Sequence, residues 1–487
     1  MFERRKTFVG GRWISASDGE VVRRYNPAST SEVVSEVPAL TPDDATTAVD
    51  HAERARPAWR DAGALARGRV LIDAAAIIRQ RADDIARDIV SEVGKTLTEA
   101  AAEVGAAAAF LEYYGGLGRG TQGEIVADRR DGVSTWWQRE PLGIVCLITP
   151  WNDPCATPAR KLGPALIAGN AVLLKPAEQT ALSALHLAAA LEVAGLPGGV
   201  LNVVTGASRR VADPVLDDDR VRAMSFTGST AVGLHLQHKL AGRMRVQTEM
   251  GGKNASLVLP DADLDMACST VVAGAMGQTG QRCTATSRVV VHRDVAAAFE
   301  EALSSHLGSL VVGSGLDDET AVGPLATDQQ LDEALAAVTQ ASSDGARVAT
   351  GGQRLRGSRH DGGHFMAPTL LCDVSPDSAA WREEIFGPVL AMTTVDTFEA
   401  GVVAVDDSDY GLSASIFTRS LESAHRFVDA VDVGQVAVNL PTTGWDVHVP
   451  FGGFKQSGSP FKEHGIRGLD FYTRVKSVAL GFGLTGS

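Results

Sequence analysis

Short apolar runs alternate with helical segments through the middle of this chain of 487 residues. The runs are continuous rather than alternately polar and apolar, which indicates strands that are buried on both faces. Such strands, joined by helices, form a parallel, doubly wound sheet. The first set of runs is "GIVCLI" (143–148), "AVLLK" (171–175), "GVLNVV" (199–204) and "VRAMSF" (221–226).

A second alternation of the same kind begins near residue 254. A chain of this length is too long for one hydrophobic core, so we expect more than one domain. The two alternations predict two α/β domains with a junction near residue 250. The second set is "NASLVL" (254–259), "SRVVVH" (287–292), a helix at 294–309 and "FGPVLAMTTV" (386–395).

The part of the chain that precedes these runs is predicted to be largely helical. Thr41 can cap a helix, Pro42 can take its first position, and Asp43 and Asp44 suit its first turn. Apolar residues then recur at helical spacing and predict one buried face. They are Leu71, Ala74, Ile78, Ile85 and Ile89.

Two further segments have the character of exposed strands. Residues 124–140 contain two short runs around an Asp-Gly dipeptide, which is typical of hairpin turns. We expect Trp136 and Trp137 to be exposed on this hairpin, which packs either against another subunit or against its own chain. The tail "FYTRVKSVAL" (471–480) alternates polar and apolar residues, as an exposed or intermolecular strand does.

Composition narrows the class of protein. The hydrophobic share of 44% and the charged share of 21% are those of an ordinary globular chain. A net charge of -14 argues against a nucleic-acid partner, which needs a basic face, but allows a local basic pocket for a small acidic substrate. No signal-peptide-like segment and no stretch of roughly 20 apolar residues is present, so we expect no membrane partner.

The cysteines predict a reduced, cytoplasmic protein. They are five in number, without a CxxC pair or a Cys/His cluster, so we expect neither a metal site nor a disulfide framework. Cys283 differs from the others because it lies among polar residues in "QTGQRCTATSR", whereas a structural cysteine usually has apolar neighbours. The four that we assign to packing are Cys146, Cys155, Cys268 and Cys372.

Four loops at predicted carboxyl ends of strands, where ligands of open α/β sheets bind, carry unusual residues. In "FTGSTAVG", Gly228 and its neighbours can bring a phosphate to a helix N-terminus. In "KPAE", Lys175 and Glu178 either bind ribose hydroxyls or form a solvated pair. "TPWNDP" contains Asn152, otherwise a turn residue, and "EMGGKNA" contains Glu249, otherwise a surface carboxylate.

These motifs, in this order and followed by "GQRC", resemble the NAD(P)-dependent aldehyde dehydrogenase superfamily. The resemblance runs nearly end to end, from "NPAST" through "EEIFGPV" to "PFGGFKQSG". It implies an α/β, aldehyde dehydrogenase-like fold with a Rossmann-type cofactor domain, an α/β catalytic domain and a β oligomerisation arm, and a homodimer or homotetramer. The expected ranges are 1–122 and 141–250 for the first, 251–450 for the second, and 123–140 with 467–487 for the arm.

The resemblance also implies residue roles. Cys283 matches the family nucleophile, Glu249 the general base and Asn152 the side-chain donor of the oxyanion hole. Glu463 resembles a second glutamate that relays protons, although "GSPFKEHG" differs in length from the commonest pattern there. The positions that match contacts to the cofactor are Trp151, Lys175, Glu178, Gly228, Ser229, Glu384 and Phe386.

The chemistry of these residue types agrees with such roles. An aldehyde has no leaving group, so loss of hydride first needs a tetrahedral centre, which a thiolate can form. The Asn152 amide and the Cys283 N–H can stabilise its oxyanion, and nicotinamide accepts the hydride. Glu249 can then deprotonate the water that hydrolyses the thioester. Glu178 would repel a 2′-phosphate, so we expect NAD, with NADP as the alternative.

The expected substrate is a short aldehyde with a carboxylate, such as succinic or α-ketoglutaric semialdehyde. By the resemblance, Asp153, Arg160, Trp445 and Phe451 face the substrate tunnel, and an arginine can bind a carboxylate through two hydrogen bonds. Arg282, beside the nucleophile, can lower the pKa of the thiol or meet an acidic substrate. If Arg160 pairs with Asp153 instead, the tunnel stays neutral and suits an aromatic or aliphatic aldehyde.

Two other classes of function are compared with this one. A CoA-acylating dehydrogenase would also use Cys283, but relatives of that type generally lack the glutamate that matches Glu249. A non-catalytic structural relative is the second alternative, and the intact set of reactive residues argues against it.

Overall fold

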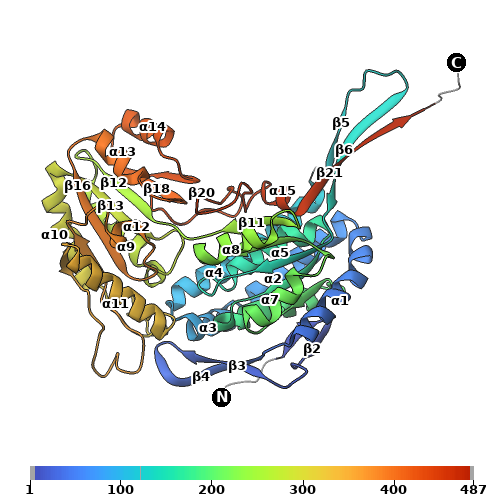
Figure 1. Cartoon of the computed structure of the whole chain (residues 1–487), viewed down its shortest axis with the longest axis horizontal. Helices are drawn as coiled ribbons and strands as arrows, with labels where there is room; N and C mark the ends of the chain where they lie inside the picture. The colour runs from blue at the N-terminus through green and yellow to red at the C-terminus, as the bar shows by residue number, and fades with distance from the viewer. Residues whose placement is uncertain (1–5, 121, 483–487) are drawn as a thin grey trace.

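Two mainly parallel sheets organise the structure, a computed structural model that describes residues 6–120 and 122–482 (Figure 1). The first sheet has five strands in the order β11-β10-β7-β8-β9, and every neighbouring pair is parallel. The predicted doubly wound sheet is therefore confirmed. Its strands are β7 Ile144–Ile148, β8 Ala171–Lys175, β9 Leu201–Val203, β10 Val221–Thr227 and β11 Arg245–Glu249.

Helices connect these strands and precede them. The Thr41 side chain accepts a hydrogen bond from Asp44 N, and the predicted helix begins at Pro42. The predicted apolar face is buried, but the chain forms two helices there, α2 and α3, that meet at Arg81. The helices of this half are α1 Pro42–Asp61, α2 Ala64–Gln80, α3 Ala82–Val93, α4 Leu97–Gly116, α5 Ala156–Ala168, α6 Ala181–Val193, α7 Ser208–Leu216 and α8 Thr230–Leu240, with the 3-10 turns η1 Leu117–Arg119 and η2 Glu178–Thr180.

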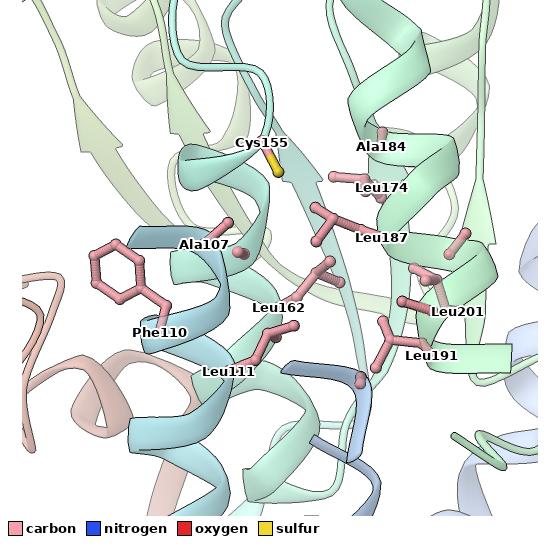
Figure 2. Packing of buried hydrophobic residues seen from close by; sticks show 14 of the residues in the cluster. Ala107, Phe110, Leu111, Cys155, Leu162, Leu174, Ala184, Leu187, Leu191 and Leu201 are labelled. Carbon is pink, nitrogen blue, oxygen red and sulfur yellow. The ribbon is translucent and has the colours of Figure 1, made fainter. Parts of the chain in front are cut away.

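Leucines fill the space between α4, α5, α6 and the first sheet. Figure 2 shows Leu162 of α5 facing Leu187 and Leu191 of α6, with Leu174 of β8 beside them. Cys155, just before α5, is fully buried at the edge of the same cluster, as expected for a packing cysteine. This apolar contact fixes the start of α5, which carries several of the residues discussed below.

The second sheet has seven strands in the order β14-β15-β16-β13-β12-β18-β19. Only β14 runs antiparallel to its neighbour. The second predicted alternation is confirmed. Its strands are β12 Asn254–Val258, β13 Thr286–His292, β14 Arg347–Thr350, β15 Thr369–Cys372, β16 Val389–Val395, β18 Ser413–Phe417 and β19 Gln435–Val438. Its helices are α9 Leu264–Met276, η3 Gly277–Gly280, α10 Arg293–Ser309, α11 Asp328–Ser343, α12 Ala379–Arg382, α13 Phe398–Asp406 and α14 Leu421–Ala430.

A three-stranded antiparallel sheet projects from the rest of the molecule (Figure 1). The predicted hairpin pairs with the C-terminal strand, but its loop spans residues 127–132, and Trp136 and Trp137 are half-buried rather than exposed. The end of the predicted arm, residues 483–487, lies outside the described residues. The strands are β5 Gly123–Val126, β6 Val133–Pro141 and β21 Thr473–Gly481, which follows α15 Gly468–Tyr472.

Three short two-stranded sheets complete the fold. They are β1 Thr7–Val9 with β2 Arg12–Ile14, β3 Val21–Asn26 with β4 Ser29–Pro38, and β17 Tyr410–Gly411 with β20 Phe454–Lys455. Among the residues that the structure describes, no helix has the length and apolar character needed to cross a bilayer. Over the same residues, no group of three or more His, Cys, Asp and Glu side chains is arranged to hold a metal ion.

Candidate active site

Cys283, Glu249 and Asn152 come together where the two large sheets meet. Glu249 is the last residue of β11, Asn152 follows β7, and Cys283 precedes β13. Glu249 and Asn152 are buried, whereas Cys283 as a residue is half-buried. The Asn152 side-chain amide donates to the carbonyl of Gln281 at 2.9 Å, which places it beside the nucleophile loop. The three predicted catalytic side chains thus share one site.

The charges around Cys283 shift its pKa and that of Glu249. Burial raises the pKa of the Cys283 thiol well above its ordinary value; the Glu249 carboxylate raises it further, and the Arg160 guanidinium lowers it. Burial also raises the pKa of Glu249 to about 7, with Arg160 acting in the opposite direction. A carboxyl group with this pKa can exchange protons near neutral pH, as a general base must.

Arg160 lies between two carboxylates and an aromatic ring. Its Nε is 2.8 Å from Glu463 Oε2, and its Nη2 is 3.4 Å from Glu249 Oε2. Its guanidinium lies over the ring of Phe451, 5.2 Å from the centroid. Asp153, the alternative partner expected for Arg160, does not form an ion pair with it. The Asp153 carboxylate contacts Lys95 and the Gln278 side chain instead.

Glu463 is held as an anion in this cluster. Burial alone would raise its pKa, but the neighbouring cations Arg160 and Lys161 lower the pKa to about 2. The Lys161 ammonium group contacts Glu463 directly and donates to Ser225 Oγ at 2.7 Å. Glu463 is therefore linked to Glu249 through the Arg160 guanidinium, and its role as a proton relay stays a prediction.

The remaining residues predicted to face the substrate are spread around this cluster. Phe451 is buried, and its ring stacks on His464 at 4.8 Å. Trp445 is half-buried and donates its indole N–H to the carbonyl of Thr442 at 3.2 Å. Arg282 is half-buried, and its charge acts on Asp153. The cation that lowers the thiol pKa most is Arg160, not the adjacent arginine.

Two of the predicted cofactor residues lie at the end of β8. Lys175 is buried, and its ammonium group donates to Ser208 Oγ at 2.8 Å. Burial lowers the pKa of Lys175 to about 8, while the nearby Glu178 carboxylate raises it. A lysine and a carboxylate side by side at the carboxyl end of a buried strand fit the hydroxyls of a ribose.

The turn from β10 into α8 fits a phosphate group. Ser229 is the N-cap residue of α8, and its side chain makes no capping hydrogen bond. The Ser229 hydroxyl therefore does not occupy the first N–H groups of the helix, which can donate to a phosphate. A Cβ on Gly228 would lie 2.6 Å from the Phe226 ring, so a larger residue here would displace that ring. A Cβ on Gly233 would lie 2.3 Å from the Met250 sulfur and would displace the methionine side chain.

The other cofactor residues lie near Glu249. The rings of Trp151 and Phe386 meet edge to face with centroids 5.4 Å apart. Glu384 Oε1 accepts from the backbone N–H of Gly252 at 3.0 Å, and a Cβ on Gly251 would lie 2.3 Å from Glu384 Oε2. Burial raises the pKa of Glu384 to about 7. The residues predicted to bind the cofactor thus extend from the N-terminus of α8 to the Cys283 thiol, as a dinucleotide cofactor requires.

The sequence did not single out several residues that support the site. The Asn254 amide donates to the carbonyls of Cys283 and Ala285, both at 2.8 Å. Asn254 belongs to the quoted segment "EMGGKNA", so its position beside Glu249 was a usable signal. Lys95 and Glu103 form a buried ion pair of 2.8 Å near Asp153, and no local pattern marks that long-range contact.

Comparison with known proteins agrees with this geometry. The model of the aldehyde dehydrogenase family matches residues 13–478. An alpha-ketoglutarate semialdehyde dehydrogenase of Haloferax volcanii is 42% identical over 98% of this chain and 99% of its own length. An alpha-ketoglutaric semialdehyde dehydrogenase of Bacillus subtilis is 38% identical over 97% of each chain.

A solved structure shares the fold closely. The NAD-dependent aldehyde dehydrogenase of Sinorhizobium meliloti superposes with a TM-score of 0.96 at 32% identity, covering 100% of this chain and 96% of that one. The order of the two sheets, the site between them and the match over nearly the whole chain lead to one conclusion: this chain belongs to the aldehyde dehydrogenase family.

Proposed function

We propose that the chain oxidises an aldehyde to the carboxylic acid with Cys283 as the nucleophile. The observation that carries this proposal is the convergence of a half-buried cysteine, a carboxyl group with a pKa of about 7 and a side-chain amide at one site. These are the nucleophile, the base and the oxyanion donor that aldehyde oxidation needs. The family assignment, to enzymes that oxidise aldehydes, supports it.

Each residue has a defined step. Glu249 accepts the thiol proton, and the Cys283 thiolate attacks the carbonyl carbon to form a thiohemiacetal. The oxyanion accepts hydrogen bonds from the Asn152 amide and from the Cys283 N–H. The bound nicotinamide cofactor supplies the hydride acceptor. After it has released the thiol proton to solvent, Glu249 takes a proton from the water that hydrolyses the resulting thioester, and the Cys283 thiolate leaves.

NAD is the preferred cofactor in this proposal, with NADP as the alternative. Lys175 and Glu178 take the adenosine ribose, and the α8 N-terminus with Gly228 and Ser229 takes the pyrophosphate. The Glu178 carboxylate favours a free 2′-hydroxyl, because it would repel a 2′-phosphate. Trp151, Glu384 and Phe386 lie on the side of the site nearer the thiol. They take the nicotinamide end of the cofactor, because the adenosine end and the pyrophosphate are assigned to the residues named above.

The substrate is a short aldehyde that carries a carboxylate, of the α-ketoglutaric semialdehyde type. Two relatives that carry this name are 38% and 42% identical to the chain. Arg160 supports the proposal because its guanidinium, whose side chain is 11% exposed, lies close enough to Cys283 to lower the thiol pKa.

An aromatic or aliphatic aldehyde is the second candidate. It is favoured by the ion pairs that Arg160 already makes with Glu463 and Glu249, which satisfy its charge without a substrate. We further propose a cytoplasmic homodimer or homotetramer. The five unpaired cysteines support a reducing compartment, and the projecting three-stranded sheet supports assembly.

NADH formation with matched aldehydes tests the substrate. We expect α-ketoglutaric and succinic semialdehydes to have a higher kcat/KM than alkyl aldehydes of equal length. Arg160→Gln should lower kcat/KM for the acid semialdehydes by about 10- to 100-fold and affect the alkyl aldehydes less, since a charged hydrogen bond contributes about 1.5–3 kcal/mol. Arg220→Gln, at an arginine that pairs with Asp218 away from the site, is the control. Equal losses for acid and alkyl substrates would exclude the carboxylate role of Arg160.

A further inference from the structure

Three successive residues just before the nucleophile adopt left-handed backbone angles. The φ values are 52° at Gln278, 59° at Thr279 and 69° at Gly280. Glycine adopts this region freely, but glutamine and especially β-branched threonine rarely do. Such a conformation persists only when contacts from the surrounding structure hold it.

Gln278 is fixed at both its backbone and its side chain. Its N–H donates to Glu99 Oε1 at 2.6 Å, from the first turn of α4. Its side-chain amide donates to Asp153 Oδ1 at 2.9 Å. Thr279 is held by a hydrogen bond from its hydroxyl to the carbonyl of Gly323 at 3.1 Å. Asp153 therefore provides the side-chain anchor at the start of the strained segment.

Asp153 is in turn held by buried groups. Its Oδ1 lies 3.1 Å from the Lys95 ammonium, which is fully buried and also pairs with Glu103. Glu103 Oε1 accepts from the backbone N–H of Cys155 at 2.7 Å, two residues after Asp153. Burial alone would raise the pKa of Asp153, but Lys95 and Arg282 hold it below its ordinary value. The carboxylate is thus charged and has little freedom to turn.

Two adjacent side chains connect the same pair of loops. Asn152 donates to the Gln281 carbonyl, and Asp153 accepts from the Gln278 side chain. One contact therefore falls at each end of the segment 278–281, directly before Cys283. The loop that carries the oxyanion donor and the loop that carries the thiol are fixed relative to each other by these contacts.

We propose that Asp153 is a positioning residue for Cys283, acting through Gln278 rather than through the substrate. It holds the left-handed 278–280 segment so that the thiol and the Asn152 amide face the same carbonyl group. This inference rests on the proposed function, because it assumes that Cys283 is the nucleophile. It assigns to Asp153 a role in turnover that does not depend on the substrate's carboxylate.

The test uses variants that separate the hydrogen bond from the charge. Asp153→Asn keeps an acceptor for Gln278 and should retain kcat within about threefold, whereas Asp153→Ala removes it and should lower kcat by about tenfold or more. Gln278→Asn tolerates the left-handed backbone but is too short to reach Asp153, so it should lose kcat to a similar extent. KM for the aldehyde should change little in all three. The loss should be equal for acid and alkyl aldehydes.

A second readout follows the thiol itself. The Asp153 charge contributes to raising the pKa of Cys283. Alkylation of Cys283 by iodoacetamide, measured against pH by mass spectrometry, should therefore shift to lower pH in Asp153→Asn and Asp153→Ala. It should keep its midpoint in Gln278→Asn, where the charge remains. This division reports the Asp153 charge, whereas a loss of kcat shared by Asp153→Ala and Gln278→Asn, with an unchanged midpoint in Gln278→Asn, reports the positioning contact.

Control measurements distinguish misfolding of a variant from failure of the Asp153 inference and from failure of the proposed function. Asp218→Ala removes an aspartate–arginine pair away from the site, and thermal unfolding of every variant reports on folding. The inference is overturned if Asp153→Ala, folded like the wild type, keeps the wild-type kcat. It is also overturned if Asp153→Asn loses as much kcat as Asp153→Ala. NADH formation by Cys283→Ser would instead overturn the proposed function.

Discussion

At the scale of single residues, the pKa of Glu249 is set by opposing effects of its surroundings. Burial raises its pKa, the Arg160 cation lowers it, and the Glu463 anion raises it again, with a result of about 7. The deprotonated carboxylate, which is the active base, therefore gains population as the pH rises through that value. Below it, the carboxyl group holds its proton and cannot accept another.

The pH dependence of kcat tests this assignment. The wild-type kcat should rise with pH through about 7, in line with the raised pKa of Glu249. Glu249→Gln should lose this rise and turn over about 10²-fold or more slowly, since general-base catalysis contributes about that much. The same pH profile in wild type and variant would assign the base to another group.

The charge of Glu178 makes a separate prediction for the cofactor. Glu178→Gln should raise the ratio of kcat/KM with NADP to kcat/KM with NAD by about tenfold, equivalent to about 1.4 kcal/mol of repulsion removed. The ratio is measured from initial rates of NADPH and NADH formation. An unchanged ratio would show that Glu178 does not face the 2′ position.

The sequence predicted the catalytic residues but not the contacts of Asp153. The roles expected of Cys283, Glu249 and Asn152 rest on a resemblance that motifs local in the chain carry, and the structure brings the three side chains to one site. The contacts of Asp153 did not follow, because Lys95 and Gln278 lie 58 and 125 residues away from it. Contacts of this kind depend on how the two halves of the molecule dock, and no periodicity in the sequence encodes them.

At the scale of elements, the connection from β11 to β12 packs directly on the nucleophile loop. A Cβ on Gly252 would lie 2.5 Å from the Cys283 carbonyl oxygen, which Asn254 binds from the same connection. The strands themselves were predictable, because their apolar runs are continuous. The close approach of this connection was not, since a pair of glycines is equally compatible with an exposed turn.

Replacement of this glycine should displace the nucleophile. Gly252→Ala should lower kcat by about tenfold or more, because small displacements of reacting groups are costly. Gly105→Ala, in α4 with no atom within 4 Å of the added Cβ, is the matched control and should keep its kcat. Steady-state rates and thermal unfolding of both variants are the measurements. Equal activity of the two variants would contradict the predicted contact.

At the scale of the whole molecule, the projecting sheet leaves apolar side chains uncovered. Ile125 of β5 is 80% exposed, and Val475 of β21 is 61% exposed. The sequence predicted the hairpin and the tail strand, but not that they pair with each other over the full length of β21. A thin sheet with exposed apolar residues is an expected site of association between copies.

The oligomeric state tests this role of the arm. Ile125→Asp should shift the assembly toward smaller species, because a buried charge in an interface is costly. Light scattering after size-exclusion chromatography measures the mass. Val193→Asp, at a residue 74% exposed at the end of α6, is the control and should leave the mass unchanged. If the mass is the same for Ile125→Asp, β5 is not part of the interface.

The distribution of the cysteines has a practical consequence. Four of the five thiols are buried, and Cys283 alone among them is partly open to solvent. A mild thiol reagent should therefore react once per chain and at the centre of catalysis, so the stoichiometry of labelling counts competent sites in a preparation. For the same reason, oxidants that reach the folded protein should inactivate it long before they unfold it.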